Sequence, residues 1–332
     1  MTVIEKHQFS KEIRDRLKPL FALNNWRGPL ELTGDYLCMA AAIYAAQWSM
    51  WFYPLAVLVV GSRQRALASL LHESCHKTFS RHRGLNNFIG RWLAGYPIFQ
   101  SHAAYVKSHV LDHHTFLGDE TRDPDYIQYV ESGLFEVRDR LDFVIRFIFK
   151  TLFLLNVANY LRYLLINRLG KDSIDRRTLT ELVVAQLAIF ALFSVTVGPV
   201  GYILYWFIPL ITTFQVIGWF TEISEHYPLI RTARSTLTIT RNRFPHAVER
   251  AFIGMHGDNY HLVHHLLAGI PFWNLRRAHA ILLDDPAYAA ANRTSGGIFT
   301  APAGRRSAIR SILDEIRVSA PLDSTVDSRQ GA

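Results

Sequence analysis

Residues 109–114 read His-Val-Leu-Asp-His-His and place three histidines within six residues. On an α-helix, His109 and His113 are four residues apart and share a face, and His114 lies next to that face. A neutral imidazole is the commonest metal ligand among side chains. This stretch therefore predicts a helix that carries part of a metal site.

Two further histidine clusters accompany this stretch, an HxxxH pair and an HxxHH triplet, and one more histidine follows Glu225. On a helix the three histidines of the triplet would point one way, because they lie at i, i+3 and i+4. A site with one metal seldom uses more than three or four protein ligands, so eight or nine imidazoles indicate two metals. The candidate ligands are His72, His76, His109, His113, His114, His226, His261, His264 and His265.

Polar side chains beside the clusters are candidates to orient these ligands. A carboxylate can accept the N–H bond of a ligand imidazole and fix the orientation of its ring. An asparagine could also ligate a metal directly or through water. The candidates are Glu73, Asp112, Glu225, Asp258 and Asn259. Imidazole suits iron, zinc, copper and nickel, so the ligand type alone leaves the metal open.

The composition favours a membrane protein. Of the 332 residues, 49% are hydrophobic and 19% charged, whereas about 25% charged residues is usual in soluble domains. The net charge of +8 would suggest a nucleic-acid partner in a soluble protein. Here we expect the basic residues to lie along a membrane surface, with no nucleic-acid partner.

The first apolar region predicts a helical hairpin. Residues 36–60 carry no charge and contain Pro54, and apolar character resumes after Arg65. We expect helices at 35–50 and 53–76, the second of which delivers the first histidine pair. Arg63 and Arg65 would then lie inside a helix and must face the bundle interior or extend toward the interface. A single span that ends near residue 60 is the rival interpretation.

The second apolar region is clearer. Residues 182–221 carry no charge, and Gly198-Pro199 interrupts them, which predicts helices at 180–197 and 200–222. Three shorter segments are expected to be helical as well. They are an interfacial or re-entrant helix at 85–99, a basic amphipathic helix on the membrane at 142–167, and an amphipathic helix at 306–318 that docks on the domain. The last dozen residues are polar, and we expect them to be disordered.

The distribution of basic residues predicts the orientation. Six of the 36 Lys and Arg residues precede residue 35, seventeen lie between 61 and 180, and thirteen follow 226. Because neither hairpin tip carries one, the positive-inside rule places both termini and all three clusters in the cytoplasm. We therefore divide the chain into a cytosolic lead-in at 1–34, a membrane domain at 35–285 and a tail at 286–332.

The three clusters resemble the histidine boxes of the membrane fatty-acid desaturase and hydroxylase superfamily. His72-Glu73-Ser74-Cys75-His76 is similar to the first box, residues 109–114 with Asp123-Pro124-Asp125 to the second, and residues 259–266 with Gly269-Ile270-Pro271 to the third. The resemblance covers roughly residues 35–285, and His226 is similar to the additional histidine found between boxes two and three.

The resemblance implies an all-α integral membrane protein with four transmembrane helices and a cytosolic helical cap that holds two iron ions. All nine candidate histidines would be ligands. It also implies activation of O₂ with two electrons from a separate donor of the ferredoxin, rubredoxin or cytochrome type and its reductase. The sequence contains no His-Pro-Gly-Gly, so no fused haem domain is expected to supply those electrons. If the source is bacterial, the protein would lie in the inner membrane.

The resemblance leaves the reaction and the substrate open. We expect a desaturase in lipid metabolism that acts on an acyl chain. A hydroxylase, monooxygenase or ketolase of the same superfamily is an alternative. The second box departs from the frequent HxxHH spacing and the first reads His-Glu, as in several hydroxylases, but neither detail decides between the two reactions. Small amino-acid-derived metabolites, such as the precursor in rhizobitoxine biosynthesis, are also substrates in this superfamily.

Two readings from other classes are weaker. His72-Glu73-x-x-His76 matches the HExxH pattern of zinc proteases, but a protease of that kind needs only one further ligand and leaves the other clusters unexplained. A metal transporter would place ionisable ligands near the middle of the bilayer, whereas all three clusters lie outside the apolar segments.

Overall fold

The computed structural model describes residues 4–171 and 173–319, and the described residues form helices and no β-strand. The predicted all-α fold is therefore confirmed. Isolated bridges join Glu5 to Ser235 and Ser295 to Arg306. The expectation for the last dozen residues concerns a part of the chain outside this description.

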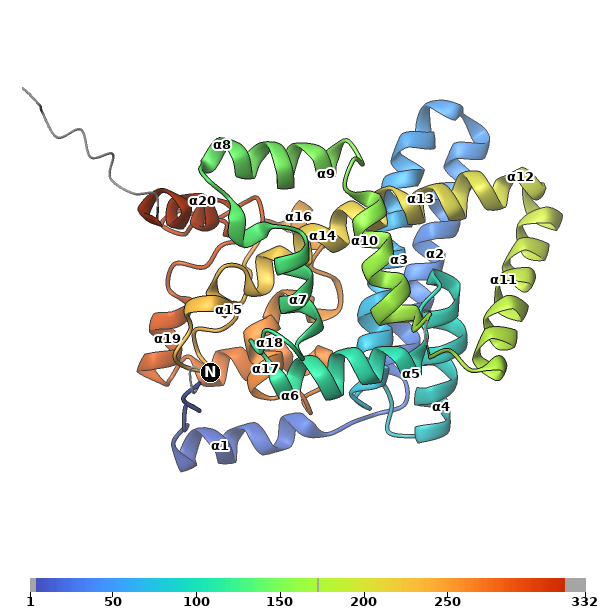
Figure 1. Cartoon of the computed structure of the whole chain (residues 1–332). Coiled ribbons are helices and arrows are strands. Elements are labelled where there is room, and N and C mark those ends of the chain that lie inside the picture. Colours follow the sequence, from blue (N-terminus) through green and yellow to red (C-terminus); the bar gives the residue numbers. More distant parts are fainter. Residues whose placement is uncertain (1–3, 172, 320–332) are drawn as a thin grey trace, which may run out of the picture.

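Helices α2 (Arg27–Trp48) and α3 (Tyr53–Cys75) form the predicted first hairpin (Figure 1). The rival interpretation, one continuous helix that ends near residue 60, is wrong because the chain turns between Trp48 and Tyr53 and α3 then continues to Cys75. Helix α2 begins eight residues before the predicted position. The charged Asp35 is accommodated inside it, since its carboxylate lies 3.3 Å from Arg63 Nη1 and 2.7 Å from His256 Nε2. Arg63 faces the bundle interior, as predicted.

The second apolar region also breaks where the sequence predicts. Helix α11 (Arg176–Thr196) is capped by Asp175, whose carboxylate accepts a hydrogen bond from Thr178 N at 2.7 Å. Gly198 has φ 86°, a conformation that favours glycine, and Pro199 begins the next helix. That helix runs as α12 (Pro199–Tyr202), a π-helical turn (Ile203–Phe207), α13 (Ile208–Ile211) and α14 (Thr213–His226).

Within the described residues, two helices are long and apolar enough to cross a membrane. They are Arg176–Thr196 and the interrupted helix that begins at Pro199. The α2–α3 hairpin is less apolar because it carries Asp35, Arg63 and Arg65 in its interior. The structure thus supports two of the four predicted spans by length and composition.

The predicted helix at 142–167 is wrong as a single element. The chain forms α8 (Arg140–Phe143), a π-helical segment and α9 (Lys150–Leu152), and then turns before α10 (Val157–Tyr163) and a second π-helical segment. Leu154 has φ 62° at this turn, and the Asn156 side chain donates a hydrogen bond to Arg146 O at 2.6 Å. A polar side chain thus satisfies a carbonyl of the first helix and supports the turn.

The other short segments are helical as predicted. The segment at 85–99 forms α4 (Arg83–Phe88), which continues through a π-helical turn (Ile89–Gly95) and a 3₁₀ turn (Tyr96–Ile98). The tail helix is α20 (Ala308–Ser319), with Ile309 and Ile312 buried. The remaining helices are α1 (Lys11–Leu17), α5 (His102–Tyr105), α6 (His114–Phe116), α7 (Pro124–Glu131), α15 (Leu229–Thr232), α16 (Ala247–Phe252), α17 (His261–Leu266), α18 (Phe272–Leu282) and α19 (Pro286–Asn292).

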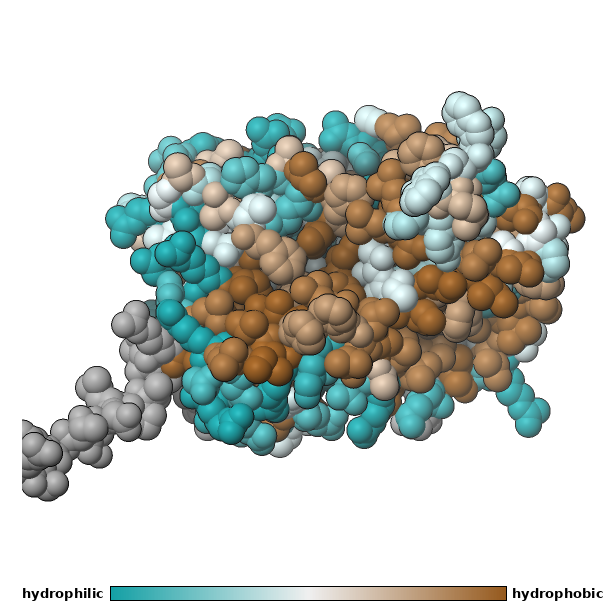
Figure 2. Space-filling model, turned by 90° about the horizontal axis from the view of Figure 1, so that it is seen from above, coloured by the Kyte–Doolittle hydropathy of each residue, from teal (hydrophilic) through white to brown (hydrophobic). Residues whose placement is uncertain are grey.

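The molecule has an apolar side and a polar side. Figure 1 places α2, α3, α11 and α12 together on one side, and α15, α19 and α20 on the other. In Figure 2 hydrophobic residues gather over the first side and extend across the centre, while hydrophilic residues lie above and below them on the second side. At the tip of the first hairpin, Trp48 and Trp51 are 84% and 93% exposed. Large exposed apolar surfaces of this kind mark contact with a membrane or a partner.

Candidate metal centre

All nine histidines predicted as ligands converge between the two sides of the molecule. The end of α3 supplies two, the π-helical segment Val106–His113 and the first residue of α6 supply three, the end of α14 supplies one and α17 supplies three. They form two adjacent groups, which we call group A and group B. Group A is His72, His76, His109, His114 and His264, and group B is His113, His226, His261 and His265.

Group A has five imidazoles whose candidate ligand atoms lie within 4.8 Å of one another. His114 Nε2 is at its centre, 3.2 Å from His109 Nε2 and 3.1 Å from His264 Nε2. In group B, His261 Nε2 lies 3.0 Å from both His226 Nε2 and His265 Nε2. Ring nitrogens from four segments of the chain therefore face two small volumes.

The π-helical segment decides which histidines share a group. In an α-helix His109 and His113 would share a face, but here His114 N donates a hydrogen bond to His109 O, five residues back. A π-helical turn brings residues i and i+5 together. His109 therefore joins group A with His114, and His113 turns to group B. The rings of His109 and His113 remain stacked at 5.2 Å, and their candidate ligand atoms lie within 4.8 Å of each other and of Asp125, so the predicted shared face is retained.

The triplet on α17 also divides between the groups. His261 and His265 are one turn apart and meet in group B. His264 points to group A, where its ring lies 4.3 Å from that of His72. The expectation that all three point one way holds for His261 and His265, and α17 thus connects the two groups.

The distances fit bound metal ions better than hydrogen bonds between histidines. Two ring nitrogens at cis positions of an octahedral metal, each about 2.1 Å from it, are about 3.0 Å apart. His226 Nδ1 donates to Ile239 O at 3.2 Å, so its Nε2 offers a lone pair to the group. Buried His76 Nε2, His109 Nδ1 and His113 Nε2 have no hydrogen-bond partner within the described chain. Such orphaned nitrogens are costly unless a cation binds them.

Two aspartates orient His113. Its Nδ1 donates to Asp123 Oδ1 at 2.8 Å and lies 3.3 Å from Asp125 Oδ2. Burial alone would lower the pKa of His113, but the two carboxylates raise it to about 9. The two carboxylates therefore favour a positive charge at the His113 ring. Either a proton or a bound metal ion would supply that charge.

Most of the other histidines of the two groups have a lowered pKa, which favours the neutral imidazole. Burial, and then the neighbouring imidazoles, hold the pKa of His109, His114 and His264 well below the usual range. The pKa of His261 and His265 is lowered in the same way. Neutral imidazole is the form that binds a metal, because the lone pair is free.

Of the five polar residues predicted to orient the ligand histidines, two lie beside a ligand ring and three do not. Glu73 Oε1 lies 3.5 Å from His72 Nδ1, and Glu225 Oε1 lies 3.4 Å from His261 Nδ1, so both stand beside a ligand ring. The other three contact different groups. Asp112 pairs with Lys107, Asp258 pairs with Arg243, and Asn259 Nδ2 donates to Arg243 O.

Sequence reasoning missed the support behind Asp125. Arg168, which is 4% exposed, places Nη2 2.7 Å from Tyr163 Oη and 3.5 Å from Asp125 Oδ1. Tyr163 Oη also donates to Asp125. The sequence indicated the Asp123-Pro124-Asp125 stretch only through its resemblance to the second histidine box. The spacing of Tyr163 and Arg168, about 40 residues later, gave no signal that they belong to the site.

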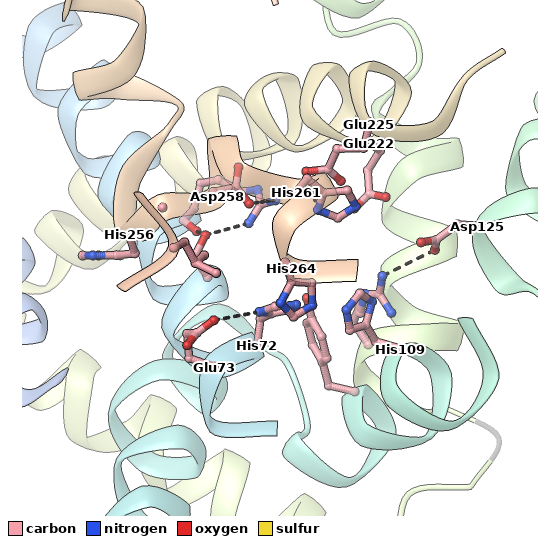
Figure 3. Close-up of a pocket in the computed structure, with 16 residues that line it drawn as sticks. His72, Glu73, His109, Asp125, Glu222, Glu225, His256, Asp258, His261 and His264 are labelled. Atoms are coloured by element: carbon pink, nitrogen blue, oxygen red, sulfur yellow. Dashed lines mark hydrogen bonds and ion pairs between the residues drawn. The ribbon is translucent and has the colours of Figure 1, made fainter. Parts of the chain in front are cut away.

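A small cavity of about 40 Å³ adjoins the two groups (Figure 3). His72, His109, His261 and His264 form one wall. Most of the other lining residues are polar or charged, and Tyr105, Gly257 and Leu275 complete the lining. The cavity therefore opens beside the candidate metal positions, and seven of its sixteen lining residues are Asp, Glu or Arg.

Comparison with known proteins assigns the family. The family model for fatty acid desaturases matches residues 46–296, and this confirms the resemblance expected over roughly 35–285. The dihydrorhizobitoxine desaturase of Bradyrhizobium elkanii is 36% identical over 94% of this chain and 91% of its own length. The sn-1 oleoyl-lipid 12-desaturase of Picosynechococcus is 24% identical over 84% of each. The chain belongs to the fatty acid desaturase family and is an oxidoreductase.

Proposed function

We propose that this member of the fatty acid desaturase family is a membrane-bound, O₂-dependent desaturase with two iron ions. The observation that carries the proposal is the pair of histidine groups, in which the central nitrogens of His114 and His261 each face two others at 3.0–3.2 Å. The five histidines of group A would hold one ion and the four of group B the other. Asp123, Asp125, Glu73 and Glu225 would orient or balance them.

Bound iron would supply the activation of O₂ and the oxidation of an unactivated C–H bond. The protein's own residues do the rest. The histidines fix the metal positions, and the carboxylates behind His113 and His261 hold the ring orientation. Burial of the site excludes water from the reacting carbons. Two electrons would come from a separate ferredoxin-, rubredoxin- or cytochrome-type donor with its reductase.

For the substrate we propose a small amino-acid-derived metabolite, of the kind on which the Bradyrhizobium relative acts by its name. The identity of 36% over nearly the whole of both chains supports this assignment. The seven charged side chains in the cavity lining also suit a small polar molecule better than an acyl chain. An acyl lipid is the second candidate, because the other relative is named an oleoyl-lipid desaturase.

The membrane topology is part of the proposal. The α2–α3 hairpin and the two helices on either side of Gly198 would form four spans, with both termini and all nine histidines in the cytoplasm. The charge distribution supports it, since no Lys or Arg occupies either hairpin tip. The exposed Trp48 and Trp51 at the first tip also suit a membrane interface.

Two other reactions, peptide hydrolysis by a zinc protease and hydroxylation, compete with desaturation as interpretations of the histidine groups. A zinc protease would need Glu73 as a free base, but Glu73 Oε2 accepts hydrogen bonds from Thr78 Oγ1 at 2.7 Å and Phe272 N at 3.1 Å. It would also leave group B without a role. A hydroxylase would use the same histidines, and the product decides between the two oxidations.

The test is metal analysis of the detergent-purified protein by mass spectrometry, followed by product analysis. We expect about two irons per chain and an O₂-dependent product two mass units lighter than dihydrorhizobitoxine, in the presence of a ferredoxin and its reductase. A product sixteen mass units heavier would assign a hydroxylase instead. One zinc per chain without iron would contradict the di-iron proposal. A variant of a histidine outside the two groups, His246→Ala, is the control for metal content.

A further inference from the structure

The charged groups around the cavity are unequally paired. Five carboxylates and two guanidinium groups line it. Most have partners in the protein: Glu73 and Asp125 as described above, and Glu225 and Asp258 through Arg243, at 3.0 and 2.7 Å. Arg243 is 2% exposed and lies behind the cavity wall. The paired carboxylates thus serve the protein itself.

Glu222 is the exception. It projects from α14 together with Glu225 toward the histidines (Figure 3) and lines the cavity. Among the described residues, no hydrogen bond or ion pair engages its carboxylate. At longer range Asp125 repels it, and Arg168 and Arg65 attract it. The Glu222 side chain is half-buried, so its unpaired carboxylate faces the open volume and is available to a cationic ligand.

Arg65 offers the opposite charge in the same cavity. Its side chain is 12% exposed, and it donates to Ser69 Oγ at 3.3 Å and lies 3.8 Å from Asp258. Both contacts are long, so most of the five guanidinium donors remain available to a ligand. Arg168 differs, because Ser108, Tyr163 and Asp125 occupy its donors.

The volume limits what can occupy the space between these groups. A volume of about 40 Å³ on this measure holds about three waters. That is enough for the ammonium and carboxylate of an amino acid. An acyl chain needs a longer cavity with an apolar lining.

We propose that the cavity binds the head group of a small zwitterion, with its ammonium on Glu222 and its carboxylate on Arg65. The neighbouring carbons of such a ligand would then lie at the wall made by His72, His109, His261 and His264. The inference rests on the proposed desaturase function for the reaction, but the binding of the head group stands on the charges of the cavity. Glu222 and Arg65 are thus specificity-determining residues.

The test is calorimetric titration of the iron-loaded protein in detergent with three matched probes. They are norleucine, 2-hydroxyhexanoate, which lacks the ammonium, and pentylamine, which lacks the carboxylate. We expect norleucine to bind about tenfold or more tightly than either, since a site built for a charged group rejects analogues that lack it. Glu222→Gln should bring norleucine to the level of 2-hydroxyhexanoate, and Arg65→Gln should bring it to the level of pentylamine. Glu12→Gln, on the exposed face of α1, should change nothing.

Equal binding of the three probes to the wild-type protein would overturn the inference, and this result needs no variant to fold. Retained discrimination in Glu222→Gln, at unchanged iron content, would overturn it too. If the protein desaturates an acyl lipid and does not discriminate among the probes, the zwitterion-binding proposal fails and the desaturase proposal stands. If the probes bind as expected but no oxidised product forms, the desaturase proposal fails and the zwitterion-binding proposal stands.

Discussion

Replacing Asp123 by asparagine should weaken the metal position of group B and leave group A occupied. Asp123 is fully buried, and each of its oxygens accepts hydrogen bonds, Oδ1 from His113 Nδ1 at 2.8 Å and Oδ2 from Gly118 N at 2.9 Å. An asparagine amide has one oxygen, so either His113 or Gly118 would then face a second donor. Loss of a carboxylate behind a ligand histidine costs about 10–100-fold in metal affinity, or about 1.4–2.7 kcal/mol.

The assay is the iron content of Asp123→Asn after dialysis against a graded series of chelator concentrations. We expect one iron to leave at a chelator activity about 10–100-fold lower than in the wild type, while the other is lost at the original concentration. Asp112→Asn is the matched control. Asp112 lies within the same cluster in sequence, but its carboxylate pairs with the exposed Lys107 at 2.9 Å. Equal retention of both irons in Asp123→Asn, or equal loss in Asp112→Asn, would refute the assignment of Asp123 to the support of His113.

Three further predictions concern stability, each measured by thermal unfolding in detergent. Gly198→Ala should destabilise by about 1–3 kcal/mol because φ is 86° there, whereas Gly34→Ala in α2 meets no neighbouring atom and should stabilise by up to about 1 kcal/mol; equal effects would exclude backbone strain at Gly198. Leu71→Ala, at a fully buried position in α3, should cost about 2–5 kcal/mol, and a smaller loss would mean that the hairpin repacks. Burial and Arg305 lower the pKa of His279 from 6.5 to about 4 in the folded protein. Between these pH values the unfolded chain binds more protons than the folded protein, so stability should fall as the pH drops from 6.5 to 4. His279→Gln should flatten that decline, and an unchanged slope would contradict the assignment.

The sequence predicted the parts of the site whose signals are local. Histidine spacing and uncharged runs are local patterns, so the nine histidines, the hairpin and the break at Gly198-Pro199 could all be found. The π-helical turn could not be predicted, because no residue type in 106–113 indicates a wider turn. The proximity of His109 to His114 follows from that turn. The choice among the acids was also beyond the sequence, since it depends on which basic side chain arrives from elsewhere. Asp258 pairs with Arg243 from outside its own cluster, whereas Asp112 pairs with the nearby Lys107.

The order in which the histidines occur along the chain affects how the protein is made. His72 leaves the ribosome about 190 residues before His261, which at 5–20 residues per second is a delay of about 10–40 s. During that time the end of α3 already carries imidazoles that lack their partners from α14 and α17. Neither group is complete until α17 has been synthesised, so metal insertion must follow translation of nearly the whole chain. Until metal binds, protein contacts alone hold together the four segments that carry the histidines.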